Sequence, residues 1–269
     1  MSHTKYDSSN IRSLLVDHDY VMMLMIDTQL IVKRDNCEQE VLLCGVRSIA
    51  HSKFFIFAIL TNGDLHGWHG DLFRKGYYSG SNKMGLYKMD LKNVQMIRCC
   101  EIQMCAITNE FELYTSQYPF KKLEKHSLLH IVDVDCGAKH ICALSKEGNV
   151  YVWGFNSHGQ LGLGDWRYRG TPEKVDLKDK DIVSVGCGDY YSMALTKSGR
   201  IHMWGCDAIY SCCVSSYIHH LYNVISISCG DKYAMAVTTK NKVYVSDVPD
   251  IATSRMHSIA NFKRIPYKF

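Results

Sequence analysis

The chain has 269 residues, of which 46% are hydrophobic and 22% are charged, and this balance excludes a disordered tail or a fibrous protein. This apolar content is enough for one large domain or two small ones. The 31 basic and 27 acidic residues give a net charge of +4, which is too small to indicate nucleic-acid binding by composition alone.

Six segments of the chain share one pattern of three expected strands. An alternating run is followed by a short apolar segment, a polar turn, and a third run rich in β-branched and aromatic residues. Polar turns that contain glycine are typical of hairpins between antiparallel strands. The six copies of the pattern begin near residues 11, 46, 94, 131, 182 and 224.

The first three copies are the most divergent. The copy that begins at residue 11 keeps apolar residues such as Leu14, but it lacks the glycine and the tryptophan of the later copies. The copy at residue 46 has a polar turn at 61–63 and Trp68 in its third run, and the copy at residue 94 keeps Cys99. These segments are identified as copies because their apolar residues fall at the same positions as in the later ones.

The last three copies align with one another without a gap. In each of them the first run ends in Cys-Gly, with the cysteine at position 136, 187 or 229. The segments between copies, such as 84–88 and 171–176, are long enough for a fourth strand. The sequence therefore predicts about six units of four short antiparallel strands.

This arrangement predicts an all-β fold that is most simply a β-propeller, because a closed ring protects the strand edges that an open sheet would expose. A linear solenoid is the alternative. We expect one domain over residues 1–269, in which residues 262–269 supply a fourth strand and residues 1–10 complete the last blade.

One copy resembles the repeat of the regulator of chromosome condensation family. The residues that carry the resemblance are Cys136-Gly137, Gly148, Trp153-Gly154 and the run Gly159-Gln-Leu-Gly-Leu-Gly-Asp165. The segments 187–205 and 229–244 match the same repeat with more differences. The resemblance implies a β-propeller of four-stranded blades. The family usually builds seven blades, so the six copies counted here leave seven as the alternative.

The resemblance implies several functions, because the family includes an exchange factor for the GTPase Ran that docks on histones, ubiquitin-ligase modules and ciliary scaffolds. We predict a protein-binding module without chemistry or a cofactor of its own, and guanine-nucleotide exchange on a Ran-like GTPase is the alternative. The expected partner is another protein, with a small GTPase or a chromatin component as candidate classes. We expect no membrane or nucleic-acid contact, and either a monomer or one component of a complex.

The loops that follow the Cys-Gly step are the predicted binding surface, because all six emerge on one face of a closed propeller and loops on a rigid scaffold carry recognition. The alternative is that they are ordinary exposed loops. The central residues of these loops are Asp19, Phe54, Ile102, Lys139, Tyr190 and Lys232. The next residue of each loop is expected to point into the blade, and these residues are Tyr20, Phe55, Gln103, His140, Tyr191 and Tyr233.

Three other groups of residues are weighed as sites and assigned to structural roles. Residues 206–220 contain three cysteines and two histidines, yet no Cys-x-x-Cys spacing, so we expect no metal there. His66 lies two residues before Trp68, a repeat position, and is expected to pack. The run of alternating aromatic and arginine residues at 166–169 is suited to stacking on a base, but a solvated loop is the default interpretation.

The twelve cysteines and the polar first ten residues indicate the compartment. No apolar run approaches the roughly 20 residues of a membrane helix, and no signal peptide is recognised. Free thiols in a reducing compartment are therefore expected, which places the protein inside the cell, in the cytoplasm or the nucleus.

Overall fold

The computed structural model describes residues 10–16, 20–34, 40–51, 55–69, 87–100, 103–117, 122–128, 130–205, 216–218, 221–247 and 263–264. Within these ranges the regular elements are the β-strands β1 to β24, so the all-β prediction is confirmed. The same ranges hold no helix that is long and apolar enough to cross a membrane.

The chain divides into two compact units, Met1–Glu101 and Ile102–Phe269. The strands of the first unit are β1 (Ile11–Val16), β2 (Tyr20–Met25), β3 (Leu30–Arg34), β4 (Glu40–Leu43), β5 (Val46–His51), β6 (Phe55–Leu60), β7 (Leu65–His69), β8 (Tyr87–Lys88) and β9 (Val94–Cys99). Whether residues 1–269 fold as one domain remains a prediction.

The second unit holds the copies that resemble the family repeat. Its strands are β10 (Gln103–Thr108), β11 (Leu113–Gln117), β12 (Glu124–Lys125), β13 (Ile131–Cys136), β14 (His140–Ser145), β15 (Val150–Gly154), β16 (Arg169–Lys174), β17 (Ile182–Cys187), β18 (Tyr191–Thr196), β19 (Ile201–Gly205), β20 (Ser216–Tyr217), β21 (Val224–Cys229), β22 (Tyr233–Thr238), β23 (Val243–Asp247) and β24 (Lys263–Arg264).

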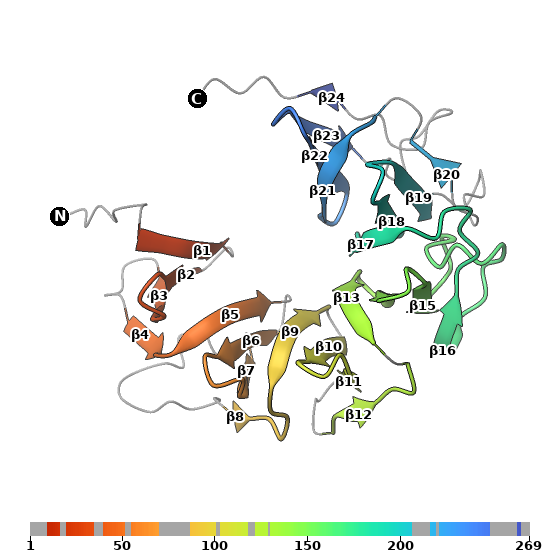
Figure 1. Ribbon diagram of the computed structural model, residues 1–269. Coiled ribbons are helices and arrows are strands. Elements are labelled where there is room, and N and C mark those ends of the chain that lie inside the picture. Colours follow the sequence, from red (N-terminus) through yellow and green to blue (C-terminus); the bar gives the residue numbers. More distant parts are fainter. Residues whose placement is uncertain are drawn as a thin grey trace. The chain divides into compact units, whose positions relative to one another are not determined.

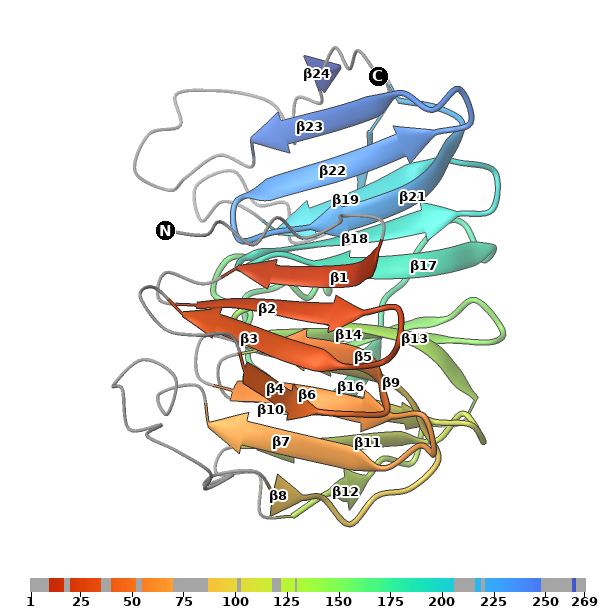
Figure 2. The ribbon, with the colours of Figure 1, turned by 90° about the vertical axis from the view of Figure 1, so that its left-hand side faces the viewer.

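In the described residues these strands form six four-stranded sheets, and the order of strands across each sheet follows the chain. Figure 2 shows β21, β22 and β23 side by side in one of them. The first strands of the six sheets begin at residues 11, 46, 94, 131, 182 and 224, which are the starts of the six sequence copies. One copy of the pattern therefore corresponds to one sheet.

The expected fourth strands come from the variable segments. Strand β16 overlaps segment 171–176, and β8 overlaps segment 84–88. The C-terminal segment also supplies a fourth strand, because β24 pairs with β23 at Tyr244 and Arg264. Residues 1–9 lie outside the described residues, so their place in the last blade stays a prediction.

The turn between the second and third strands explains how the divergent copies keep the repeat geometry. In three of the copies this turn has glycine at positive φ, for example Gly63 at +82° and Gly148 at +79°. At the equivalent positions Thr28 and Phe111 adopt φ values of +69° and +62°. Positive φ is unfavourable for residues of this kind, so the fold imposes this turn even where glycine has been lost.

The core of the second unit lies between consecutive sheets. The first strands β13, β17 and β21 are neighbours, and within this unit the later strands of each sheet lie farther from them (Figure 1). All six residues of β14 and of β18 are buried, because within this unit both faces of their sheets are covered. This packing fixes the ends of the strands, and with them the loops that the strands carry.

Candidate functional site

Three of the six predicted contact residues lie in the described part of the chain, and all three are in the second unit. Lys139, Tyr190 and Lys232 are exposed and lie in the connections β13–β14, β17–β18 and β21–β22. The backbone N–H of Asp189 donates to the carbonyl oxygen of Asp231 at 3.1 Å, so the last two connections are neighbours. The remaining three, Asp19, Phe54 and Ile102, lie outside the described residues.

The residues that follow these positions were expected to point into the blade. The prediction is confirmed for Phe55, His140 and Tyr191, whose exposed fractions are 4%, 0% and 1%. It is wrong for Tyr233, which is 56% exposed. The side chain of Tyr191 reaches the next sheet, where its hydroxyl donates to the carbonyl oxygen of Gly230 at 3.0 Å. In the described part of the second unit no sheet follows β21–β24, so no next sheet of this unit covers Tyr233 there. Of the other two, Gln103 is half-buried, and the side chain of Tyr20 is outside the described residues.

A second loop joins the predicted ones at the same edge. In an antiparallel meander, the connection from the first to the second strand and the connection from the third to the fourth strand emerge at the same edge of the sheet. Residues 155–168 form the latter connection, between β15 and β16. The backbone N–H of Phe155 donates to the carbonyl oxygen of Lys139 at 2.9 Å, which joins this loop directly to the β13–β14 connection.

The two loops and Tyr190 together present a cluster that we call the aromatic surface, made of Lys139, Phe155, His158, Tyr168 and Tyr190. The ammonium group of Lys139 lies 5.4 Å from the centre of the Phe155 ring. The Phe155 and Tyr168 rings meet edge to face at 5.6 Å, and the His158 and Tyr190 rings lie 4.4 Å apart. Phe155, Tyr168 and Tyr190 are 45%, 59% and 41% exposed, so the cluster faces solvent.

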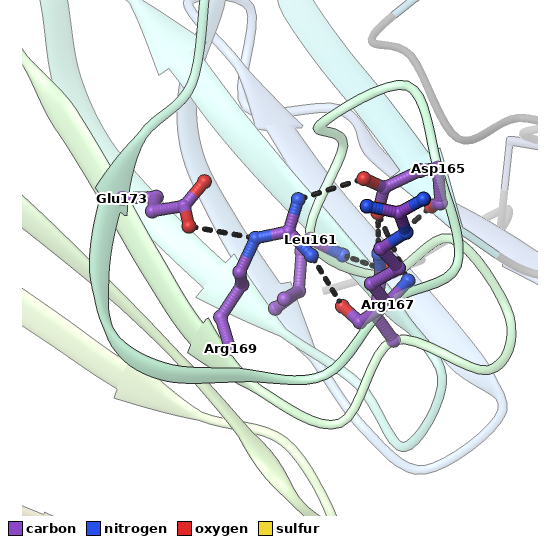
Figure 3. A network of polar contacts seen from close by, with 6 residues as sticks. Leu161, Asp165, Arg167, Arg169 and Glu173 are labelled. Atoms are coloured by element: carbon purple, nitrogen blue, oxygen red, sulfur yellow. Dashed lines mark hydrogen bonds and ion pairs between the residues drawn. The ribbon is translucent and has the colours of Figure 1, made fainter.

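Polar contacts hold the 155–168 loop in one conformation. The side-chain amide of Asn156 donates to the carbonyl oxygen of Asp165 at 2.8 Å, and its oxygen accepts from the N–H of Leu161 at 2.9 Å. One carboxylate oxygen of Asp165 accepts from the backbone N–H of Arg167 at 2.9 Å (Figure 3). Asn156 is buried, so these bonds are shielded from water.

Arg169 links this loop to the fourth strand. Figure 3 shows its guanidinium between the carboxylates of Asp165 and Glu173, each 2.7 Å away. The hydrogen bond from Arg169 lowers the pKa of Asp165, and the two carboxylates raise the pKa of Arg169. The charged forms are therefore the stable ones, and the ion pairs persist around neutral pH.

The inner side of the loop is anchored in the core through one carbonyl group. The oxygen of Gln160 accepts from the hydroxyl of Ser192 at 2.8 Å and from the indole N–H of Trp204 at 2.9 Å. Because the single hydroxyl proton of Ser192 points to Gln160, the contact of 2.9 Å between Ser192 Oγ and His140 Nε2 requires the imidazole to donate. A chain of hydrogen bonds thus runs from His140, the first residue of β14, to the loop.

Burial keeps His140 neutral. Its side chain is fully buried, and desolvation lowers its pKa from 6.5 to about 4. A neutral imidazole that donates through Nε2 has an unprotonated Nδ1, and this atom has no hydrogen-bond partner among the described residues. The network that supports the aromatic surface is therefore uncharged at neutral pH.

A group of buried ligand atoms lies beside this network and was not anticipated from the sequence. The ligand atoms of His140, Cys142 and Cys187 lie within 4.8 Å of one another. Each of them already takes part in a hydrogen bond, since His140 and Cys142 contact Ser192, and Cys187 donates to the carbonyl oxygen of Asp135. Burial raises the pKa of the Cys187 thiol, which favours the protonated form rather than a metal-binding thiolate. We assign the group to packing.

Of the three other candidate sites considered from the sequence, the structure describes the residues of two. Trp68 is 1% exposed and His66 is half-buried with its pKa lowered by burial, so packing is confirmed for this pair. In the 166–169 run Trp166 is 48% exposed, whereas Arg169 is committed to its ion pairs. The cysteines and histidines at 206, 212, 213, 219 and 220 lie outside the described residues, so the expectation of no metal there stays a prediction.

Comparison with known proteins identifies the repeat. A family model described as the regulator of chromosome condensation (RCC1) repeat matches residues 147–195, and a second model of the same description matches residues 131–160. Both matches include part of the 155–168 loop. The loop is therefore a regular part of the repeat.

Among curated proteins, human E3 ubiquitin-protein ligase HERC2 is 30% identical over 194 residues, which are 60% of this chain and 4% of HERC2. Ras guanine nucleotide exchange factor C from Dictyostelium discoideum is 38% identical over 82 residues, which are 28% of this chain and 6% of that protein. The chain thus spans only a small part of the length of these relatives.

Among solved structures, Prp20p from Saccharomyces cerevisiae aligns with a TM-score of 0.72 at 14% identity, covering 90% of this chain and 72% of Prp20p. That structure was described together with the binding of Prp20p to Gsp1p and histones. A likeness at this level of identity concerns the fold. Residues 131–195 match the repeat of the regulator of chromosome condensation family, and the chain shares the β-propeller fold of Prp20p.

Proposed function

We propose that the chain is a protein-binding module without chemistry of its own, and that the aromatic surface of the second unit contacts the partner. The observation that carries this proposal is the cluster of three exposed aromatic rings beside Lys139, on loops that converge at one edge of the strands. Exposed aromatic residues are enriched in protein interfaces. The binding of Gsp1p and histones described for Prp20p supports a protein as the class of partner.

The rigidity of the 155–168 loop adds to this argument. The side chains of Asn156, Asp165 and Arg169 fix the loop from within, and the Gln160 carbonyl is held from the core. A loop that is already ordered loses little conformational entropy when a partner binds. The aromatic side chains are therefore presented in a form suited to recognition.

The proposal keeps the six loop residues predicted from the sequence and extends them with Phe155, His158 and Tyr168. Of the six, Tyr190 and Lys139 belong to the aromatic surface, and Lys232 lies on the neighbouring connection. Asp19, Phe54 and Ile102 stay in the proposal as contact residues of the first repeats. We further propose that the protein works inside the cell, as a monomer or as a component of a complex.

We expect the double substitution Phe155→Ala and Tyr190→Ala to weaken partner binding by about 2 kcal/mol or more, roughly thirtyfold, because truncated central aromatics usually dominate the loss of affinity. The measurement is quantitative affinity purification from cell extract with the full chain as bait, followed by titration of the partner that it identifies. The melting temperature should not change, since both residues are exposed.

The matched control is Tyr222→Ala. Tyr222 is 58% exposed and lies two residues before the start of β21, so it lies at the opposite edge of the strands from the aromatic surface. We expect the control to bind like the unsubstituted protein. Normal binding by the double variant together with loss of binding by Tyr222→Ala would overturn the assignment of the surface.

Guanine-nucleotide exchange on a Ran-like GTPase is the second candidate function. It is favoured by the match to the Dictyostelium exchange factor and by the acidic residues Asp189 and Asp231, which lie on adjoining connections. We expect no strong acceleration of nucleotide release. Release of a fluorescent GDP analogue from Ran, followed at catalytic concentrations of this protein, is the test, and fast release would replace the binding-module proposal by exchange.

A further inference from the structure

A pocket of about 420 Å³ lies within the first unit, whereas the residues of the aromatic surface belong to the second unit. Five of its seven lining residues are polar and come from the first strands β1, β5 and β9. These five are Arg12, Ser13, Arg47, Ser48 and Gln95. Among the described residues, the lining contains two guanidinium groups, two hydroxyl groups, one amide and no carboxylate.

The repeat explains why these side chains meet. Arg12, Arg47 and Gln95 each occupy the second position of the first strand in their copy of the repeat. Equivalent positions on consecutive first strands face the same way, so the two arginines line one pocket. In the second unit the same position holds valine or isoleucine, at residues 132, 183 and 225. The cationic character is therefore specific to the first unit.

The guanidinium of Arg47 is held in place before any ligand binds. Its Nη2 atom donates to the carbonyl oxygen of Val94 and, at 3.0 Å, to that of Gln95. Both bonds use the same nitrogen, whereas a guanidinium has five N–H groups in a fixed fork. These two bonds fix the orientation of the guanidinium, and with it the directions of the N–H groups on Nε and Nη1. Binding of an anion to these N–H groups therefore costs less conformational entropy.

We propose that this pocket binds a phosphate group, either as the free ion or as a phosphomonoester. Two positive charges line one pocket, and no carboxylate is among its described lining residues, which favours an anion. Two guanidinium groups and two hydroxyl groups offer more hydrogen-bond donors than the two oxygens of a carboxylate can use, and they suit a tetrahedral dianion. Arg12 and Ser13 are exposed, so the site is open to a ligand from solution.

The proposal is tested by isothermal titration calorimetry of the full chain with inorganic phosphate at constant ionic strength. Arg12→Gln should weaken binding about tenfold or more, because it removes a charged, fork-shaped donor. Arg12→Lys, which keeps the charge but not the fork, should fall between this variant and the unsubstituted protein. The matched control is Lys33→Gln, since Lys33 is an exposed cation of β3 that does not line the pocket, and it should bind phosphate normally.

A second titration, with capped phosphoserine and capped serine, identifies the source of the phosphate. Tighter binding of phosphoserine than of inorganic phosphate assigns the pocket to a phosphorylated protein side chain, and the reverse order assigns it to the free ion. If neither ligand binds, or if Arg12→Gln and Lys33→Gln change the affinity equally, the proposal is wrong. This result would leave the aromatic surface untouched, because the two sites share no residue.

Discussion

Replacement of Trp204 by alanine is expected to lower the free energy of unfolding of the second unit by about 3–5 kcal/mol, the usual cost of removing a large buried aromatic side chain. Trp204 is 0% exposed and packs among the buried residues between β14 and β18. The substitution also removes the indole N–H that donates to the carbonyl oxygen of Gln160. Urea unfolding followed by circular dichroism measures the change.

Two features of the loop make Trp204 more than a packing residue. Gly162 has a φ of +66°, and a Cβ atom at this position would lie 2.7 Å from the Trp204 ring, so the loop backbone rests directly on the indole. Without the ring, the 155–168 loop loses both a hydrogen bond and its support. Trp166→Ala is the control, because Trp166 is 48% exposed and its loss should change stability by less than about 0.5 kcal/mol. Equal effects of the two substitutions would contradict this role.

Acid is expected to destabilise the second unit through His140. The pKa of His140 is about 4 in the folded protein and near 6.5 in the unfolded chain, so the unfolded state binds more protons between these values. The free energy of unfolding should therefore be unaffected by this residue above pH 6.5 and fall by about 3 kcal/mol as the pH drops to 4. Below pH 4 both states are protonated, and the loss is complete.

The measurement is a series of urea unfolding curves between pH 7 and pH 4 for the unsubstituted protein and for His140→Gln. Glutamine can still donate to Ser192 but does not titrate in this range. Burial also lowers the pKa of His126 and His202, so both proteins should lose stability in acid, but the variant should lose about 3 kcal/mol less. Parallel curves for the two proteins would show that His140 does not carry this dependence.

Local patterns in the sequence predict most of the strands because each copy of the repeat carries the same signals. Alternation and the polar turn mark the first three strands even in the divergent copies, where Phe111 replaces the turn glycine at positive φ, whereas the Cys-Gly step marks only the last three copies. The fourth strands are less well marked, since β8 and β24 are only two residues long. Their pairing depends on the preceding strand of the sheet rather than on their own residues.

The sequence predicted two of the five residues of the aromatic surface. Lys139 and Tyr190 follow from the position of the Cys-Gly step, whereas no sequence signal indicated Phe155, and Tyr168 belongs to the 166–169 run, for which a solvated loop is the default interpretation. The prediction did not use the topology of the sheet. In a meander, the connection from the third to the fourth strand emerges at the same edge as the connection from the first to the second strand. The error at Tyr233 has a different origin, since its burial depends on a further sheet and not on its own loop.

The pair Arg12 and Arg47 shows another limit of motif searches. The two residues are far apart in sequence, and neither belongs to a recognised motif. Their common position in the repeat is nevertheless visible once the copies are aligned. The side-chain environment of His140 could not be inferred in this way, because the hydroxyl of Ser192 and the carbonyl of Gln160 come from separate parts of the chain.

Site-specific photo-crosslinking in living cells tests most directly whether the aromatic surface binds a protein. A photoreactive phenylalanine analogue placed at Phe155 or Tyr190 of the full chain should crosslink to the same partner from both positions. At Tyr222, an equally exposed position at the opposite edge of the strands, the analogue should give no such product. Crosslinking to a partner from Tyr222 alone, with none from Phe155 or Tyr190, would contradict the account.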